Sequence, residues 1–195
     1  DLIDAHRDID KLMPFLHLPV QSGSNNILKA MNRKHERDLY FNIMDDLRKA
    51  RPNIAFASDF IVGFPGETES EFNELLDFIK EAKLDRVGCF KYSAVEGATA
   101  NELDNPVPEE LKDERWHRFM ALQQEISAER LQQKVGQSID VMIDEIGADG
   151  AVGRSKGDAP EIDGVVYVAD ATNLKPGDIV NRRVLDADDY DLWTA

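Results

Sequence analysis

The sequence predicts an α/β domain built on parallel strands, followed by a small all-β barrel. Strand-like apolar runs alternate with helical patterns over residues 15–92, which is typical of a parallel sheet with right-handed crossovers. One long helical stretch then covers residues 108–134, rich in Glu, Arg and Gln. After it, only short strands and turn signals follow, as in an OB-like module. We therefore expect three parts, at residues 1–107, 108–134 and 135–195.

The first strand is expected at residues 15–20, where it meets a polar loop, Gln21–Ser24. Ser24 is a plausible N-cap for a short helix that contains Ile27, Leu28 and Met31. His17 alternates with two leucines in this strand, which favours a histidine satisfied within the core over a ligand.

A second helix is predicted over residues 36–50 and is ended by Pro52. Its spacing predicts one buried face, formed by Leu39, Ile43, Leu47 and Ala50.

The next strand is predicted over residues 54–63. Thr68 and Glu71 form a capping box that begins the following helix. The buried face of that helix is expected to hold Phe72, Leu75, Leu76 and Ile79. Residues 86–92 give another strand, in which Cys89 has the character of a small buried hydrophobe.

The second half of the chain changes in rhythm. Residues 93–107 form a Gly-, Pro- and Asn-bearing loop before the long helix. Four strands are then predicted, at residues 138–145, 150–154, 164–168 and 178–185, separated by turn signals such as Asp163-Gly164.

Composition restricts the class of protein. The 195 residues are 42% hydrophobic and 31% charged, which is ordinary for a globular domain. No run approaches the roughly 18 apolar residues of a membrane span, so we expect no membrane partner. The single cysteine excludes an internal disulfide and fits the reducing cytoplasm. A net charge of −15 disfavours non-specific nucleic-acid binding, which needs Lys and Arg.

The junction at residues 58–68 is the strongest local signal of a site. A strand ends in Gly63-Phe64-Pro65-Gly66 and a capped helix follows at once. In an α/β barrel such junctions lie at the catalytic face. Glycine would let a ligand approach the backbone closely, and Glu67 lies beside a helix N-terminus. A plain turn with a helix cap explains the same residues equally well.

Two further polar segments follow neighbouring strands. Gln21 and Ser22 could hydrogen-bond a ribose or a carboxylate, and Arg33 could pair with a carboxylate. Tyr92 ends the last strand and could form a wall of a pocket, although packing at the sheet edge is an equal alternative. The phosphate-binding, dinucleotide-binding and zinc-protease motifs are absent from the sequence, as is a serine nucleophile elbow.

Several of these motifs, taken in order, resemble the radical S-adenosylmethionine methylthiotransferases. The resemblance rests on Leu16–Ser24, Met31-Asn32-Arg33 and Ser58–Thr68. It implies that the first part is the C-terminal half of a TIM-type radical-SAM barrel and that residues 135–195 are a TRAM domain. It also implies S-adenosylmethionine as cofactor, and two 4Fe–4S clusters in a full-length enzyme.

The resemblance places a set of residues around S-adenosylmethionine. Arg33 would lie near its carboxylate, and the remaining members would line the nucleoside. The set is Gln21, Ser22, Arg33, Asp59, Ile61, Gly63, Glu67 and Tyr92.

Two branches of the family compete. The MiaB-like branch modifies an adenosine of transfer RNA, and the RimO-like branch methylthiolates the β-carbon of an aspartate in small-subunit ribosomal protein twelve. The RimO-like branch is favoured by Leu84–Ser93, Val95–Ala98, Gly153–Ser155, Asp158–Gly164 and Tyr190–Trp193. A cluster-less protein-docking module is a third alternative.

Charge favours the same branch independently. Residues 136–195 hold 13 Asp and Glu against 5 Lys and Arg, a net charge of −8. A β-barrel that binds transfer RNA should be basic, whereas this one would attract a basic ribosomal protein. Asp186, Asp188 and Asp189 are the expected docking residues.

The family's CxxxCxxC motif and its other cluster cysteines are absent from the sequence. In the family they precede the region that begins at Asp1, so the resemblance implies a C-terminal fragment. We expect no catalytic residue and no metal ligand in this chain, and no activity from it alone.

Overall fold

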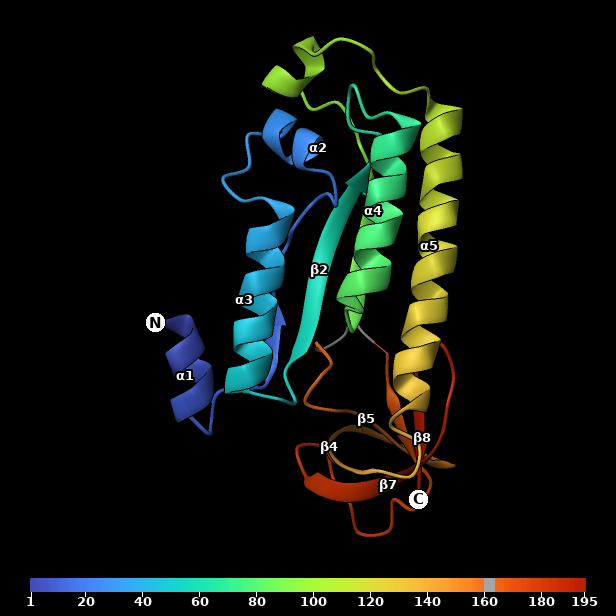
Figure 1. Ribbon diagram of the computed structural model, residues 1–195. Helices are drawn as coiled ribbons and strands as arrows, with labels where there is room; N and C mark the ends of the chain where they lie inside the picture. Colours follow the sequence, from blue (N-terminus) through green and yellow to red (C-terminus); the bar gives the residue numbers. More distant parts are fainter. Residues whose placement is uncertain (160–163) are drawn as a thin grey trace.

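Figure 1 shows the computed structural model, which describes residues 1–159 and 164–195. A three-stranded parallel sheet is followed by a long helix and a closed five-stranded barrel. This architecture agrees with the predicted fold class, a partial α/β barrel and a small all-β barrel. Part of the predicted segment Asp158–Gly164, together with the Asp163 position of its turn, lies outside the described residues.

The sheet has the order β1-β2-β3, with strands Phe15–His17, Ala55–Val62 and Arg86–Lys91. The first crossover contains α2 (Asn25–Ala30) and α3 (Arg37–Ala50), and the second contains α4 (Glu69–Ala82). Alternate residues of β2 point to opposite faces. Phe56, Phe60 and Val62 belong to the core under the helices.

β1 is shorter than the predicted strand because Pro19 has no N–H to donate to the ladder. A side chain replaces the lost backbone contact. The Ser58 hydroxyl accepts the Val20 N–H at 3.1 Å and donates to the Leu18 carbonyl at 2.9 Å. The chain therefore stays beside β2 as far as Gln21, which forms an isolated parallel bridge with Phe60.

The capping box predicted for α4 is confirmed. Thr68 Oγ1 accepts the Glu71 N–H at 3.3 Å, and Glu71 Oε2 accepts the Thr68 N–H at 2.8 Å. The helix buries Phe72, Leu75 and Ile79 as expected, with Phe78 and Ala82 also buried, whereas Leu76 is only partly buried.

The face predicted for α3 is wrong at Leu39, which is 48% exposed. Leu47 is buried as predicted and Ile43 is partly buried, whereas Tyr40 and Met44 are buried without having been predicted. The helix is turned because the Tyr40 hydroxyl donates to the Leu18 carbonyl at 2.8 Å, beyond the end of β1. A hydroxyl can lie at the bottom of a core when such a partner is available.

Two short helices were missed by the sequence analysis. α1 (Leu2–Asp8) begins with a capping box between Asp1 and Asp4, and η1 (Thr99–Glu102) lies in the expected loop. His17 is a third correction. Its side chain is 49% exposed on the face of the sheet opposite the helices, so it is not a core histidine.

α5 (Glu109–Gln132) joins the two parts of the molecule and lies along α4 in Figure 1. At 1.5 Å per residue it is about 36 Å long. Phe119 and Ile126 pack in the core of the sheet, whereas Leu131 belongs to the core of the barrel.

The barrel closes in the order β4-β5-β6-β8-β7. A bulge in β4 between Ile143 and Glu145 increases the local bend. The strands are Ser138–Gly147, Gly150–Arg154, Val166–Val168, Leu192–Thr194 and Ile179–Ala187, in that spatial order. The last strand in the chain, β8, was not predicted, because three residues are too few to show a period.

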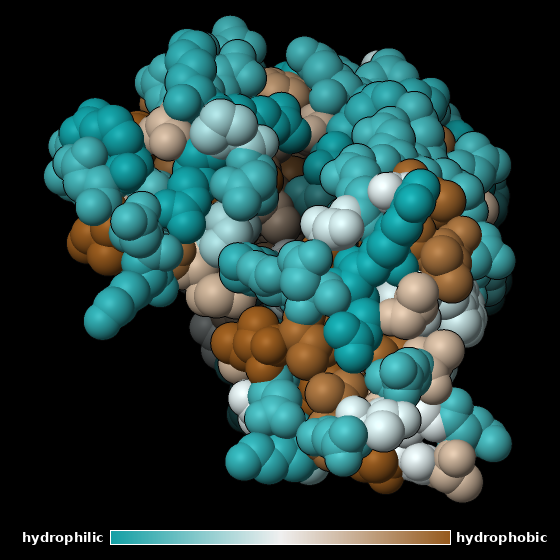
Figure 2. All heavy atoms as spheres, turned by 90° about the horizontal axis from the view of Figure 1, so that it is seen from below, coloured by the Kyte–Doolittle hydropathy of each residue, from teal (hydrophilic) through white to brown (hydrophobic). Residues whose placement is uncertain are grey.

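Some apolar side chains of the barrel stay exposed, among them Ile146, Ile179 and Leu185. Seen from below, apolar side chains gather in a patch surrounded by hydrophilic ones (Figure 2). Among the described residues, no helix is both long and apolar enough to cross a membrane.

A buried ion pair fixes the barrel to the sheet. Arg86 of β3 donates to Asp158 Oδ1 from Nη2 at 2.5 Å and from Nε at 3.2 Å. The other carboxylate oxygen accepts the Ser155 N–H and hydroxyl, at 3.1 and 2.6 Å. Arg86 also donates to the Tyr190 carbonyl at 3.1 Å. Removing one partner would leave the other charge buried and unpaired.

Substituting Asp158→Asn is expected to lower the free energy of unfolding by about 3–5 kcal/mol, because Arg86 would lose its countercharge in a buried position. Urea titration followed by circular dichroism measures it. Asp144→Asn is the matched control, since Asp144 is 39% exposed and pairs with Arg154 on the barrel surface. It should cost less than about 1 kcal/mol. Equal losses in the two variants would show that the Arg86–Asp158 ion pair does not hold the barrel to the sheet.

Candidate functional site

The carboxyl ends of the three parallel strands lead into the predicted site segments. Gln21 follows β1, Gly63 follows β2 and Tyr92 follows β3. In α/β barrels this end of the strands carries the ligand-binding loops. α3, α4 and α5 pack on one face of the sheet, and its other face is left without a helix among the described residues.

A polar pair lies on that helix-free face. His17 Nε2 and Asp59 Oδ2 are 3.0 Å apart, on the neighbouring strands β1 and β2. Gly88 is the register partner of Asp59 on β3. A Cβ at Gly88 would lie 2.6 Å from Asp59 Oδ1, so this glycine leaves the carboxylate its space.

Apolar side chains continue the same face toward the carboxyl ends. Ile61 lies two residues beyond Asp59 and is in register with Phe90 of β3. Phe90 is 58% exposed. Together the polar pair and these two side chains form what we call the ledge, defined as His17, Asp59, Ile61 and Phe90. A polar acceptor beside an apolar surface is a combination that lines many small-molecule sites.

Sequence reasoning placed Asp59 and Ile61 in the site and missed His17 and Phe90. Alternation within the strand carried a usable signal, because it puts His17 on the face opposite Leu16 and Leu18. The pairing with Asp59, however, depends on the register of two strands that are 42 residues apart.

Glu67 is buried in an ion pair rather than exposed at the helix end. Its Oε1 accepts from Arg115 Nη1 at 2.8 Å and from the Gly63 N–H at 2.9 Å. Both charged side chains are 2% exposed or less. Burial raises the pKa of the Glu67 carboxyl, against the opposing effect of the Gly63 N–H and the Arg115 guanidinium. These contacts hold the β2–α4 turn to α5.

The space beside Gly63 is filled by protein. Its φ is +73°, and an added Cβ would collide with the side chain of Lys112 from α5. The Lys112 ammonium in turn donates to the Tyr92 carbonyl at 3.0 Å and to Glu109 at 2.6 Å. The close approach predicted for a ligand at this glycine is therefore made by a lysine stem. Gly66, with φ +85°, has no atom closer than 3.9 Å to an added Cβ.

The loop after β1 is held by its own contacts. Gln21 has φ +79°. Its N–H donates to the Asp59 carbonyl and its carbonyl accepts the Ile61 N–H, so both of its backbone groups are bonded to β2. Ser22 is 1% exposed and its hydroxyl accepts the Ser24 N–H at 3.2 Å. Ser24 occupies the N-cap of α2 as expected, although its side chain makes no capping bond. Arg33 is exposed just beyond α2.

Tyr92 lies at the end of β3 in contact with the loop that follows. Its hydroxyl donates to Asn101 Oδ1 at 2.8 Å, and its ring meets Phe64 edge-on at 5.3 Å. It therefore closes the carboxyl end of the sheet, between the β2–α4 turn and η1.

The three predicted docking residues are not equivalent. Asp188 Oδ1 accepts the backbone N–H groups of Tyr190 and Asp191 at 2.9 and 2.8 Å, within a turn. Asp189 accepts from Gln124 of α5. Asp186 stays exposed on β7.

The residues present do not fit an iron–sulfur cluster, which needs several thiolate ligands. Cys89 is the one cysteine of the sequence. It is buried as predicted, and burial raises the pKa of its thiol. Within the described residues, His, Cys, Asp and Glu form no group that could hold a metal ion.

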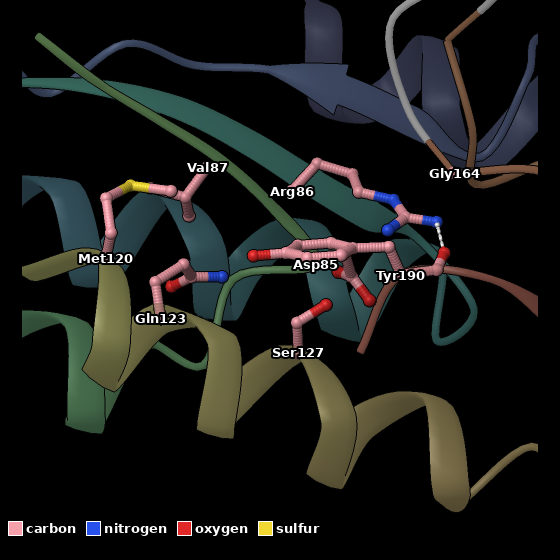
Figure 3. A pocket seen from close by; sticks show the side chains of 8 residues that line it. All are labelled: Asp85, Arg86, Val87, Met120, Gln123, Ser127, Gly164 and Tyr190. Carbon is pink, nitrogen blue, oxygen red and sulfur yellow. Dashed lines mark hydrogen bonds between the residues drawn. The ribbon is translucent and has the colours of Figure 1, made fainter. Parts of the chain in front are cut away.

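A cavity of about 280 Å³ lies between the sheet, α5 and the barrel (Figure 3). Sequence reasoning did not foresee it, because it forms where three distant segments meet. Gln123 points into it from α5, and its buried Oε1 has no hydrogen-bond partner in the described part of the chain. The lining residues are Asp85, Arg86, Val87, Met120, Gln123, Ser127, Gly164 and Tyr190.

Comparison with known proteins covers both parts of the chain. The family described as the radical SAM superfamily matches residues 1–79, and the TRAM domain family matches residues 135–195. Among solved structures, coproporphyrinogen III oxidase (HemN) from Escherichia coli has a TM-score of 0.56 at 20% identity, over 66% of this chain and 30% of that one. The latter similarity shows the fold alone.

Closely similar curated proteins carry the name ribosomal protein uS12 methylthiotransferase RimO. Identity is 60% for the Cronobacter sakazakii protein, 59% for that of Salmonella schwarzengrund and 58% for that of Klebsiella pneumoniae. Each alignment covers 94% of this chain and 42% of the relative. The chain thus spans about two fifths of the length of these relatives.

Substituting Glu67→Gln is expected to lower the free energy of unfolding by about 3–5 kcal/mol, because the buried Arg115 would lose its closest countercharge and keep only the exposed Glu69, at 3.6 Å. Urea titration measures the loss. Glu129→Gln is the control: Glu129 is 53% exposed and pairs with Lys83 at 3.0 Å, away from Arg115, so less than about 1 kcal/mol should be lost. A loss at Glu67 no larger than at Glu129 would refute the structural role given to the Glu67–Arg115 pair.

Cys89 is expected to react with iodoacetamide at pH 8 about tenfold or more slowly in the folded protein than in urea. Its raised pKa keeps the thiol protonated, and the thiolate is the nucleophile. Mass spectrometry of timed samples measures the two rates. Similar rates would show that this thiol is accessible in the native state.

Proposed function

The chain belongs to the radical S-adenosylmethionine methylthiotransferase family, and from this premise we propose that it is part of the enzyme that methylthiolates the β-carbon of an aspartate in ribosomal protein uS12. The observation that carries the proposal is the 58–60% identity to proteins of that name along 94% of the chain. It extends through the sheet and the barrel alike.

S-adenosylmethionine is proposed to bind on the ledge and at the carboxyl ends of the strands. Asp59 and Ile61 supply a hydrogen-bond acceptor and an apolar surface, and Gly88 leaves room beside the carboxylate. Arg33 is exposed beyond α2, from where it can pair with a ligand carboxylate. If S-adenosylmethionine binds there, these residues would hold and orient it, and it would supply the radical chemistry of the complete enzyme.

The other predicted ligand residues have a supporting part in this proposal. Glu67 and Gly63 hold the β2–α4 turn against α5, and Ser22 holds the loop after β1. Gln21 and Tyr92 stand at the ends of their strands. Positioning of this kind keeps a ligand-binding surface rigid before the ligand arrives.

The thiolates for two 4Fe–4S clusters are proposed to come from polypeptide beyond this sequence. The one cysteine present is buried with a raised pKa, which is unsuited to a cluster ligand. We therefore expect the chain alone to be inactive, and the complete enzyme to act in the cytoplasm, where its substrate is made.

The barrel is proposed to recruit the substrate protein. Its net charge of −8 over residues 136–195 repels phosphate and attracts a basic protein. This charge also argues against the transfer-RNA activity of the MiaB-like branch, because counterion release requires basic side chains. We also propose domain limits at residues 1–107, 108–134 and 135–195. They are supported by the order of the elements, in which the parallel sheet is followed by α5 and then by the barrel strands.

In the complete enzyme, Asp59→Asn is expected to weaken S-adenosylmethionine binding about tenfold, because a charge-assisted hydrogen bond becomes a neutral one. Isothermal titration under anaerobic conditions gives the affinity. Asp46→Asn, on the exposed side of α3, is the control and should leave it unchanged.

The proposed substrate is tested separately. Mass spectrometry of uS12 after incubation with the complete enzyme should show the methylthio group, and nucleoside analysis of transfer RNA should show none. Modified adenosine without modified uS12 would overturn the proposed function.

A further inference from the structure

The outward face of the barrel carries a continuous row of side chains across its strands. Glu145 of β4 is in register with Val152 of β5, and Val152 with Tyr167 of β6. Tyr167 is in register with Trp193 of β8, which faces Asp186 of β7. We call this set the docking row. Its three central members are apolar or aromatic, and its two ends are carboxylates.

The aromatic centre of the row is exposed. Tyr167 and Trp193 are 37% and 36% accessible. Their rings stack at 5.2 Å between centroids with 19° between planes. They line a groove of about 540 Å³, together with Val152, Leu185 and the turn Gly147–Gly150. A stacked pair offers a broad, rigid surface that loses little side-chain entropy on binding.

The carboxylates at the ends are available to an outside cation. Neither Glu145 nor Asp186 forms an ion pair within residues 1–159 and 164–195. One Asp186 oxygen accepts the Ala187 N–H at 2.9 Å, and the other accepts no hydrogen bond from the residues that the structure describes. Asp149 adds a further carboxylate at the groove.

We propose that the docking row binds an arginine-bearing segment of a basic protein. One guanidinium would stack on Trp193 or Tyr167, and neighbouring basic side chains of the same segment would pair with the two end carboxylates. Guanidinium groups stack on aromatic faces and pair with carboxylates, so this row matches both of their preferences. The inference rests on the proposed function and names the surface by which the barrel holds its protein substrate.

The opposite charge would be needed for nucleic acid. Stacked aromatics on an OB-like barrel can also receive bases, but such sites combine stacking with a basic groove. Here carboxylates stand at both ends of the row, and the barrel has a net charge of −8. Coulomb repulsion of phosphate therefore favours the protein partner.

The row also revises the expected docking residues. Asp188 is engaged by backbone N–H groups and Asp189 by Gln124 of α5. Of the three expected aspartates, Asp186 alone belongs to the row.

The test measures binding of purified uS12 to the complete enzyme by isothermal titration. Trp193→Ala is expected to weaken binding at least about tenfold, as for a central aromatic residue of an interface. Ile179→Ala is the matched control. Ile179 is 64% exposed on the same barrel but outside the groove, so its loss should change the affinity less than about twofold.

A second variant keeps the aromatic pair intact. Glu145→Gln combined with Asp186→Asn should slow association and flatten its dependence on salt, because end carboxylates steer a cationic partner. Both side chains are exposed, so folding should be preserved, as checked by circular dichroism. This variant decides the outcome if Trp193→Ala proves unstable.

The outcomes separate the two proposals. Unchanged uS12 affinity in both variants would overturn the docking row while leaving the proposed function in place. Failure of the unaltered enzyme to bind or modify uS12 would overturn the proposed function itself. Loss of single-stranded RNA binding in Trp193→Ala, with uS12 binding intact, would assign the row to nucleic acid and overturn this inference.

Discussion

The buried ion pair between Glu67 and Arg115 is the contact on which the rest of the arrangement depends. It fixes the long helix α5 to the turn after β2, so that Lys112 fills the space beside Gly63. A buried pair of this kind adds little net stability, but it tolerates no other register, since either charge alone is costly. The helix then delivers Leu131 into the core of the barrel. Together with the Arg86–Asp158 pair, this contact sets the positions of both halves.

Local chemistry in the sequence was enough to predict most elements of the fold. The Thr68–Glu71 capping box, the alternation in β2 and the turn signals of the barrel each act over a few residues. Errors arose where a distant partner decides the outcome. The hydroxyl of Tyr40 finds its acceptor at the Leu18 carbonyl, so Tyr40 rather than Leu39 joins Leu47 in the core. The short strand β8 pairs with β6 and β7 and so closes the barrel.

The candidate site was predictable only in part, for the same reason. Asp59 and Ile61 could be placed at a strand end by position alone. The partnership of Asp59 with His17 and the row through Tyr167 and Trp193 require the register of strands, which no local pattern specifies. A glycine in a sequence is ambiguous, because the space left by its missing Cβ can be taken either by a ligand or by a neighbouring side chain. At Gly63 it is taken by Lys112.

The length of α5 has a consequence for the proposed docking of a protein substrate. The helix begins beside the turn after β2 and ends in the barrel, about 36 Å further on. A guest held at the barrel would therefore have to extend roughly ten residues of stretched chain to reach the strand ends. Selection by such a rigid spacer would depend on the distance between the anchoring segment and the target residue. A compact protein that carries the right side chain, but has no flexible segment of that length, would not be modified.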